Sequence, residues 1–374
     1  MPQTVESDHD LIVFSHLRWH FVTQRPQHII SRLAQDRKVL FIEEPVKFTK
    51  KNKGTAKIVD INSNLTVLQP RISAHNFIPE LVPIVQKYSK KLALKDPVLW
   101  IYSAMFSHIC SSIDYSLIVY DCMDELAAFK GASRKMITEE KYLLSIADIV
   151  FTGGKSLYES KKKEHSNVYC FPSSVDHNHF EKAFDTKTKI PDDFSAIKKP
   201  IVGFYGVLDE RLNLPLIEKI ARLAPEISFV FIGPVVKISK SNLPRRKNIF
   251  YLGSRDYEVL PNYLKEFDVA MMPFALNKAT KYISPTKTLE FMAALKPIVS
   301  TPIHDVVRDY EKEIAIANKP EEFVKAVKFY IEEPDIQKKK RIELMKKVIE
   351  KNSWDATVKE MNEIVLKALE NKKI

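Results

Sequence analysis

The sequence predicts an α/β protein of two domains, each with a mainly parallel sheet. The chain has 374 residues, more than one hydrophobic core usually takes, which favours two domains. Short, wholly apolar runs such as Leu11–Phe14 and Ile201–Tyr205 are typical of strands buried on both faces. Helical segments follow these runs, and the alternation of strand and helix indicates parallel βαβ units.

Composition indicates a globular protein with an anionic partner. Hydrophobic residues make up 45% and charged residues 28% of the chain, as expected for a globular domain. The formal charge of +11 favours nucleic acid, acidic lipid or a phosphorylated substrate as partner. We see no stacking motif with interleaved basic residues, so nucleic acid is not expected. With 8 glycines, a phosphate site must rely on helix starts and basic side chains.

The termini and the cysteines predict a cytoplasmic location. Residues 1–10 are polar and acidic, so no signal peptide is expected. No run of 18 apolar residues occurs, so no membrane span is expected. Cys110, Cys122 and Cys170 show neither metal-ligand spacing nor a pairing framework, which favours reduced thiols.

The first βαβ unit carries a loop rich in basic residues. A strand at 38–42 follows a helix at 27–34 that Pro26 opens. Arg18, Arg25 and His28 surround this helix start, and ligands gather at the carboxyl ends of parallel strands. We expect these side chains to face a diphosphate or an anionic acceptor. The alternative is a solvated basic turn.

Further along, residues 47–57 read as a surface loop, and residues 83–95 read as a helix. Its lysines are Lys87, Lys90, Lys91 and Lys95. A basic amphipathic helix binds an anionic membrane, or it simply packs on the core with a solvated back.

Strands are expected at 98–102, 117–120 and 149–151, with a helix at 139–147 between the last two. The second of these strands ends at Asp121, which is followed by Asp124. These two carboxylates are the polar groups available at this strand end for any acid–base or positioning role. The alternative for Asp124 is capping of the next helix.

A polar stretch with two prolines at 190–200 reads as a linker, after which a second strand–helix series begins. Strands are expected at 201–205, 229–232, 249–253 and 269–274, with a helix at 214–223. The last helices are expected at 321–332, 335–351 and 354–372. We therefore predict a first domain over 1–185, joined by the terminal helix 354–374, and a second domain over 198–353.

The segment 282–301 carries the clearest functional signal. Ser284 reads as a helix N-cap and Pro285 as the first helical residue of a helix that runs to Leu295. A helix start attracts phosphate, Lys287 adds a full charge there, and Glu290, one turn further along, suits two ribose hydroxyls. The alternative is an ordinary capped helix with a surface lysine and glutamate.

This segment resembles the nucleotide-sugar motif of retaining GT-B glycosyltransferases of the group 1 type. Its SPTKTLE and KPIVSTPI runs, together with QRPQH at 24–28, resemble a bacterial subgroup of cell-surface polysaccharide synthesis that includes teichuronic-acid-type transferases. Glu290 matches the second glutamate of the motif, whereas Tyr282 stands where the first is expected. The chain also has Val207 in place of the usual phosphate-binding arginine, so Arg211 is our candidate for that role.

The resemblance implies a GT-B fold of two facing Rossmann-like domains with a C-terminal crossover helix. The second domain is expected to hold a UDP- or GDP-linked sugar, and the first to hold a glycan or lipid-linked acceptor. The expected reaction is hexosyl transfer with retention, without cofactor or metal, at the inner face of the cell membrane. The expected catalytic residues are Arg211, Lys287, Asp121 and Arg25, and the expected donor-binding residues are Gly206, Ser254, Tyr257, Asn277, Ser284, Thr286, Glu290 and His16. The rival hypotheses are a sugar-nucleotide epimerase and a nucleotide-sugar-binding protein without turnover.

Overall fold

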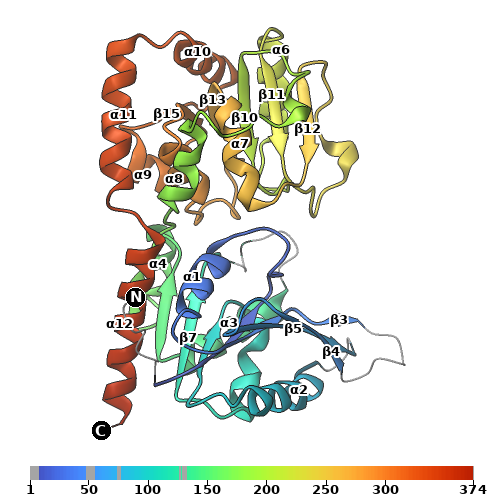
Figure 1. Ribbon diagram of the computed structural model, residues 1–374, viewed down its shortest axis with the longest axis vertical. Coiled ribbons are helices and arrows are strands. Elements are labelled where there is room, and N and C mark those ends of the chain that lie inside the picture. Colours follow the sequence, from blue (N-terminus) through green and yellow to red (C-terminus); the bar gives the residue numbers. More distant parts are fainter. Residues whose placement is uncertain (1–7, 48–54, 74–76, 126–127, 129–132, 374) are drawn as a thin grey trace. The chain divides into compact units, whose positions relative to one another are not determined.

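The computed structural model describes residues 8–47, 55–73, 77–125, 128 and 133–373. The chain divides into two compact units (Figure 1). Unit 1 comprises Met1–Pro172 with Asp355–Ile374, and unit 2 comprises Ser173–Trp354. In the part of the chain described here, no helix has the length and apolar character needed to cross a membrane.

Unit 1 is built on a nine-stranded sheet in the order β3-β5-β2-β1-β6-β7-β8-β9, with β4 paired to β5. Among the strand pairs in the described part of the chain, β4–β5 is antiparallel and the others are parallel. The strands are β1 (Leu11–Ser15), β2 (Val39–Glu43), β3 (Val46–Lys47), β4 (Thr55–Asp60), β5 (Leu65–Ile72), β6 (Val98–Ile101), β7 (Leu117–Cys122), β8 (Ile149–Thr152) and β9 (Val168–Cys170). The apolar runs predicted for β1, β2, β6, β7 and β8 are buried throughout.

The prediction of a surface loop over 47–57 was wrong at both ends, because Lys47 belongs to β3 and residues 55–57 belong to β4. Residues 48–54 lie outside the described residues. The mostly exposed β4 shows no clear apolar alternation, and its backbone pairs with β5 from Thr55 opposite Arg71 to Asp60 opposite Thr66. This hairpin is a feature that the sequence reading missed.

The helices of unit 1 are α1 (Arg25–Leu33), α2 (Phe77–Leu92), α3 (Arg134–Ile146), α4 (Lys155–Lys161) and nearly all of α12 (Trp354–Lys372), with a 3-10 helix at Ala104–Ser112. Helix α12 packs on this unit, burying Met361 and Val365. Ion pairs connect its two ends to the rest of the unit. Asp355 lies 2.5 Å from Arg32, and Lys372 lies 2.7 Å from Asp148.

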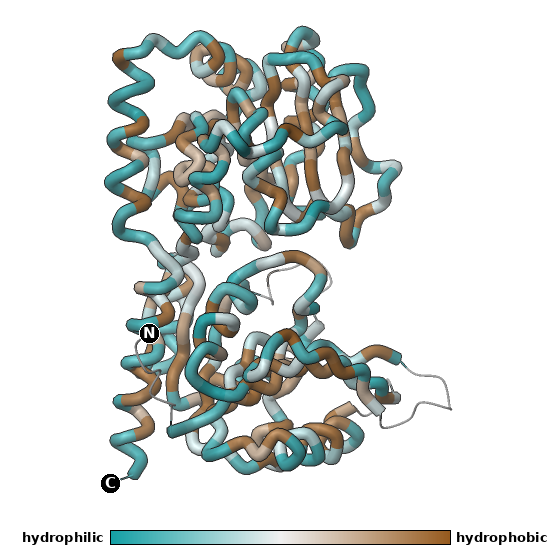
Figure 2. Tube along the Cα trace, viewed as in Figure 1, coloured by the Kyte–Doolittle hydropathy of each residue, from teal (hydrophilic) through white to brown (hydrophobic). Residues whose placement is uncertain are grey.

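Unit 2 contains a six-stranded parallel sheet in the order β12-β11-β10-β13-β14-β15. The strands are β10 (Ile201–Tyr205), β11 (Ser228–Ile232), β12 (Ile249–Gly253), β13 (Val269–Met272), β14 (Ile298–Ser300) and β15 (Ala315–Ile316). The helices are α5 (His177–Phe180), α6 (Leu214–Leu223), α7 (Leu260–Glu266), α8 (Thr286–Ala293), α9 (His304–Tyr310), α10 (Pro320–Ile331) and α11 (Asp335–Ile349). Figure 2 shows hydrophobic residues concentrated along the strands of this sheet, where they form one core.

The boundary between the units falls between Pro172 and Ser173, not at the predicted positions 185 and 198. Phe180 and Phe194, which precede the predicted second domain, are buried in the core of unit 2. His179 also bonds through Nε2 to the carbonyl of Tyr257 at 2.9 Å. Burial of these aromatic side chains therefore assigns the segment before 198, including part of the predicted linker, to unit 2.

Candidate functional site

Two glycines close the carboxyl ends of β10 and β11. Gly206 and Gly233 have φ angles of +146° and +145°, which other residues rarely adopt. A Cβ atom on Gly233 would lie 1.9 Å from the carbonyl oxygen of Gly206, so the two strand ends approach too closely for a side chain. A Cβ on Gly206 would lie 3.5 Å from Cε of Lys287. Lys287 therefore passes directly over the predicted donor-binding glycine.

Lys287 and Glu290, one turn apart on α8, form an ion pair at this point. Nζ of Lys287 lies 3.1 Å from Oε2 of Glu290 and donates to Oγ1 of Thr286 at 3.2 Å. The same Nζ lies 5.2 Å from the ring centroid of Tyr205, the last residue of β10. The structure thus brings together Gly206, Thr286, Lys287 and Glu290, which the sequence reading had assigned to a donor site.

The carboxylate of Glu290 belongs to a residue that is 4% exposed. The buried Tyr205 hydroxyl lies next to it, and burial together with the Glu290 charge raises the pKa of Tyr205 well above its usual value. Tyr205 therefore stays a neutral phenol beside the carboxylate. Sequence reasoning assigned Tyr205 only to a buried strand, because nothing near it in the sequence marks it as a neighbour of Glu290.

Ser284 does not cap α8 as predicted. The helix begins at Thr286, and Pro285 takes the N-cap position with an extended ψ of 121°. The Pro285 carbonyl accepts a hydrogen bond from the amide of Thr288 at 3.1 Å. The carbonyl of Ser284 instead accepts a bond from Oγ of Ser173 at 2.7 Å. Because proline carries no capping side chain, the first amides of α8 have no cap from the N-cap residue.

Tyr257 is held by a residue that the sequence reading missed. Its ring stacks on His179, with centroids 4.2 Å apart and planes 11° apart. Burial lowers the pKa of His179, so the imidazole stacks as a neutral ring. His179 precedes Tyr257 by 78 positions, and no local pattern relates the two. Ser254, the other candidate after β12, is exposed.

Arg211 is held by a neighbouring carboxylate. Its Nε lies 3.0 Å from Oδ1 of Asp209, and its NH2 lies 2.8 Å from Oδ2 of the same group. Asp209 is thus an ion-pair partner of Arg211. Asp209 is buried, so it neutralises part of the charge that Arg211 would offer to a diphosphate.

The loop before α8 joins the Arg211 loop. The amide of Ala275 donates to the Arg211 carbonyl at 2.7 Å. Asn277 is exposed, and its Oδ1 accepts a bond from the amide of Thr280 at 3.1 Å, closing a turn. Contact of Asn277 with a sugar stays a prediction.

Arg25 and Asp121 form a buried pair inside unit 1. Nε of Arg25 lies 2.9 Å from Oδ1 of Asp121, and NH1 donates to the carbonyl of Phe171 at 2.7 Å. Trp100 donates to the other Asp121 oxygen at 3.4 Å. Arg25 is 3% exposed and Asp121 is 0% exposed. The buried pair thus has a structural role inside unit 1, and the contact of Arg25 with a diphosphate and the catalytic role of Asp121 stay predictions.

The remaining candidates of unit 1 lie near strand ends. His16 is half-buried in the turn after β1, and its contact with a donor stays a prediction. Asp124 does not cap α3, because Ser133 takes that role by accepting a bond from the amide of Met136 at 3.2 Å. Residues 126–127 and 129–132, in between, lie outside the described residues.

Comparison with known proteins agrees with this arrangement. Residues 199–333 match the family model of the group 1 glycosyl transferases. The chain is also 25% identical over 221 residues to a Bacillus subtilis (strain 168) protein described as a teichuronic acid biosynthesis glycosyltransferase, TuaH. That match covers 54% of this chain and 55% of the relative, so the chain matches about half the length of this curated relative.

Solved structures resemble the chain over nearly its whole length. Sucrose-phosphate synthase from Thermosynechococcus elongatus has a TM-score of 0.70 at 13% identity, covering 96% of this chain and 98% of that one. A trehalose-6-phosphate protein from E. coli bound with UDP-2-fluoro glucose has a TM-score of 0.68 at 13% identity, covering 98% and 99%. HepE of Anabaena, in complex with UDP and glucose, has a TM-score of 0.65 at 12% identity, covering 96% and 99%.

The similar solved structures show the fold, and the family model matches a segment of unit 2. The predicted α/β architecture of GT-B glycosyltransferases is confirmed by structures that align over both units. The matched range 199–333 contains β10 to β15 and the Lys287–Glu290 pair. Residues 199–333 therefore match the group 1 glycosyl transferases, within a chain whose fold is that of GT-B structures.

Proposed function

We propose that the chain transfers a sugar from a nucleotide diphosphate sugar to a hydroxyl group of a glycan or lipid-linked acceptor. The observation that carries this proposal is the Lys287–Glu290 pair at the start of α8, set over the glycine at the end of β10. Ligands of parallel α/β sheets bind outside the carboxyl ends of the strands. A cation, a helix start and a carboxylate gathered at that edge suit the diphosphate and ribose of a nucleotide sugar.

In the proposed reaction, the bond between the anomeric carbon and the diphosphate oxygen breaks. The acceptor oxygen bonds to that carbon, its proton passes to the departing diphosphate oxygen, and the nucleoside diphosphate leaves with the bonding electrons. Lys287 and the amides of α8 stabilise the negative charge that builds on the leaving group. When the donor is bound, the Glu290 carboxylate accepts hydrogen bonds from the ribose hydroxyls, which replace its ion pair with Lys287. We propose retention of configuration, which the resemblance to the group 1 transferases supports.

Surface polysaccharide synthesis is the proposed role, and UDP-linked sugars are the first donors to test. The role is supported by the description of the Bacillus subtilis relative. The donor is supported by two neighbouring structures that were solved with UDP or a UDP-sugar.

A donor screen tests the proposal. Each common UDP- and GDP-linked sugar is incubated with the protein, with and without acceptor glycans, and nucleotide release is measured together with the sugar product. Acceptor-dependent release with a new glycosidic bond supports transfer. Release or isomerisation of the sugar without any acceptor supports the rival epimerase-type chemistry. Binding without turnover for every donor supports a nucleotide-sugar-binding protein.

Glu290→Ala is expected to weaken binding of the nucleoside diphosphate without unfolding the chain. Each lost hydrogen bond from ribose to the carboxylate is expected to cost about 1.5–3 kcal/mol, which is roughly 10- to 150-fold in affinity. Calorimetric titration measures the effect. Glu321→Ala, an exposed glutamate on α10, is the matched control, and equal affinities in the two variants would remove Glu290 from the site.

We also propose peripheral contact with an anionic membrane through α2. Lys87, Lys90, Lys91 and Lys95 are all exposed, on or just beyond a helix that buries Leu81, Ile84 and Val85. Near an anionic surface each lysine contributes about 1 kcal/mol, screened over roughly 8–10 Å at physiological salt. This contact would place the chain at the inner face of the cell membrane.

Vesicle co-sedimentation is expected to show stronger binding to anionic than to neutral vesicles, lost in high salt. Replacement of all four lysines by glutamine is expected to abolish the difference, whereas Lys141→Gln, on α3, is expected to preserve it. Equal sedimentation of the wild-type protein with both vesicle types would favour an acceptor in solution.

A further inference from the structure

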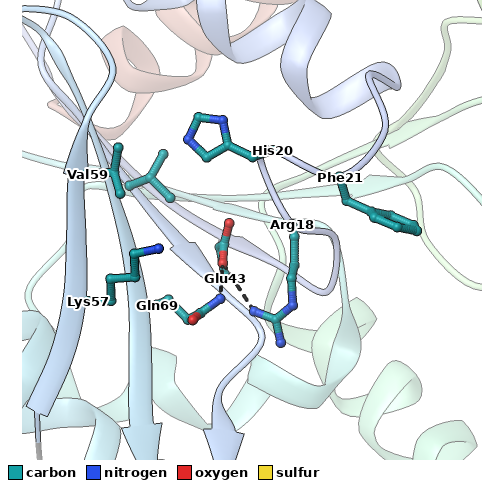
Figure 3. A pocket seen from close by; sticks show the side chains of 8 residues that line it. Arg18, His20, Phe21, Glu43, Lys57, Val59 and Gln69 are labelled. Atoms are coloured by element: carbon teal, nitrogen blue, oxygen red, sulfur yellow. Dashed lines mark hydrogen bonds and ion pairs between the residues drawn. The ribbon is translucent and has the colours of Figure 1, made fainter. Parts of the chain in front are cut away.

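Unit 1 contains a pocket of about 230 Å³ that no part of the donor site uses. It lies at the carboxyl ends of β1 and β2 and is walled by the β4–β5 hairpin (Figure 3). The lining residues are Arg18, His20, Phe21, Glu43, Lys57, Val59, Val67 and Gln69. Pockets for drug-sized ligands usually measure about 300–1,000 Å³, so this one suits a single sugar ring rather than a longer glycan.

A buried, hydrogen-bonded carboxylate, that of Glu43, lines the pocket. Glu43, the last residue of β2, is 4% exposed. Its two oxygens accept bonds from the amide of Trp19 at 2.8 Å, from NH1 of Arg18 at 3.1 Å and from Nε2 of Gln69 at 2.8 Å. Figure 3 shows Arg18 and Gln69 converging on this carboxylate from the loop and from the hairpin.

The loop that carries Arg18 is also fixed by hydrogen bonds from the side chain of Gln27. Nε2 of Gln27 donates to the carbonyls of Arg18, Trp19 and Val22 at 3.3, 3.0 and 3.2 Å. The Trp19 ring packs edge-on against Phe41 of β2, with centroids 5.0 Å apart. Ordering this loop in advance lowers the entropic cost of binding a ligand there.

The hairpin adds a second cation and an apolar surface. Lys57 lies opposite Gln69, and Val59 lies opposite Val67, in the antiparallel register of β4 and β5. Because side chains alternate along a strand, these four residues share one face of the hairpin. Figure 3 shows the Lys57 amine directed toward the pocket.

Charge decides which ligand this pocket favours. Arg18 is neutralised by Glu43, but its side chain remains 36% exposed and can donate further hydrogen bonds. Lys57 is exposed, and within the described ranges no carboxylate lies within ion-pair distance of it. The pocket therefore carries one uncompensated positive charge, beside Val59 and Val67, which suit the C–H face of a sugar ring.

From this arrangement we infer that the pocket binds an acceptor sugar unit with one negative charge, either a carboxylate or a phosphate. The assignment as an acceptor site rests on the proposed glycosyl transfer. In this acceptor site, Lys57 and Arg18 bind the anionic group of the sugar. Gln69 and His20 contact its hydroxyls. Glu43 does not touch the sugar but positions Arg18 and Gln69.

Binding of three probes to the wild-type protein tests the inference without any turnover. Ligand-observed NMR titrations compare methyl glucuronide, glucose 6-phosphate and methyl glucoside. We expect one anionic probe to bind about tenfold more tightly than the neutral one, and which of the two does so identifies carboxylate or phosphate. Binding of no probe, or equal binding of charged and neutral probes, would overturn the inference.

Variants then locate the charge. Lys57→Ala is expected to remove most of the preference for the anionic probe, Lys57→Arg to retain it, and Lys141→Ala, on α3 outside the pocket, to leave it unchanged. An undiminished preference in Lys57→Ala would overturn the assignment. If probe binding fails while the donor screen shows transfer, only this pocket is misassigned. If transfer fails while the charged probe still binds, the proposed function is the part that falls.

Discussion

Lys287→Ala is expected to lower kcat at saturating donor by about 10²–10³-fold, the loss typical of removing one group that stabilises charge in the transition state. Lys287 contacts Glu290, Thr286 and the ring of Tyr205, so its amine lies where the diphosphate is proposed to leave. Its charge contributes most when the bond to the sugar breaks, and kcat should therefore fall more than donor affinity. Steady-state kinetics with the donor identified by the screen measures both quantities.

Two matched variants show whether the effect belongs to the position. Lys325→Ala removes an exposed lysine on α10 of the same unit and should leave kcat unchanged. Arg211→Ala should lower kcat less than Lys287→Ala, because Asp209 already neutralises the Arg211 guanidinium in the unliganded protein. A Lys287→Ala variant with full kcat would exclude Lys287 from the reaction centre.

Arg25→Ala is expected to destabilise unit 1 by about 3–5 kcal/mol, because it leaves the buried charge of Asp121 without its partner. The structure gives Arg25 this structural role, and the functional role expected from the sequence stays a prediction. Arg25 links Asp121 at the end of β7 to the carbonyl of Phe171, and its NH2 lies 4.0 Å from the sulfur of Met361 on α12. Urea unfolding followed by fluorescence measures the loss.

Arg32→Ala provides the control from the same helix. Arg32 pairs with Asp355, whose side chain is 82% exposed, and such pairs contribute about 0–1 kcal/mol. Its loss should therefore barely change the unfolding midpoint. Unchanged stability of Arg25→Ala together with a lower kcat would restore the original hypothesis that Arg25 acts on the substrate.

Much of the fold could be predicted because its signals are local. Runs such as Leu11–Phe14 and Ile201–Tyr205 became buried strands, since uninterrupted apolar residues form a strand only where both faces are covered. The spacing of Lys287 and Glu290 places both on one face of a helix, and the structure joins them as an ion pair. The helices at the end of the chain were also predicted within a few residues of α10, α11 and α12.

The errors came from contacts between residues far apart in the sequence. Arg25 reads as a loop arginine at a helix start, and only Asp121, 96 positions later, makes it a buried residue. Likewise, the predicted domain boundary missed Phe180 and Phe194, which join a core formed by later strands. Ser284 looked like a helix cap until the extended backbone of Pro285 moved the helix start to Thr286.

The sequence by itself determined the two α/β halves, the helix that carries Lys287 and Glu290, and the pair of charges that this helix presents, because periodicity and spacing are properties of neighbouring residues. Only the tertiary structure decided which charged groups are exposed to a ligand. The register of β4 with β5 sets Lys57 opposite Gln69, and the Gln69 side chain in turn meets Glu43 from another strand. Such pairings depend on how distant strands align, and the free energy of burying or exposing a charge follows from that alignment.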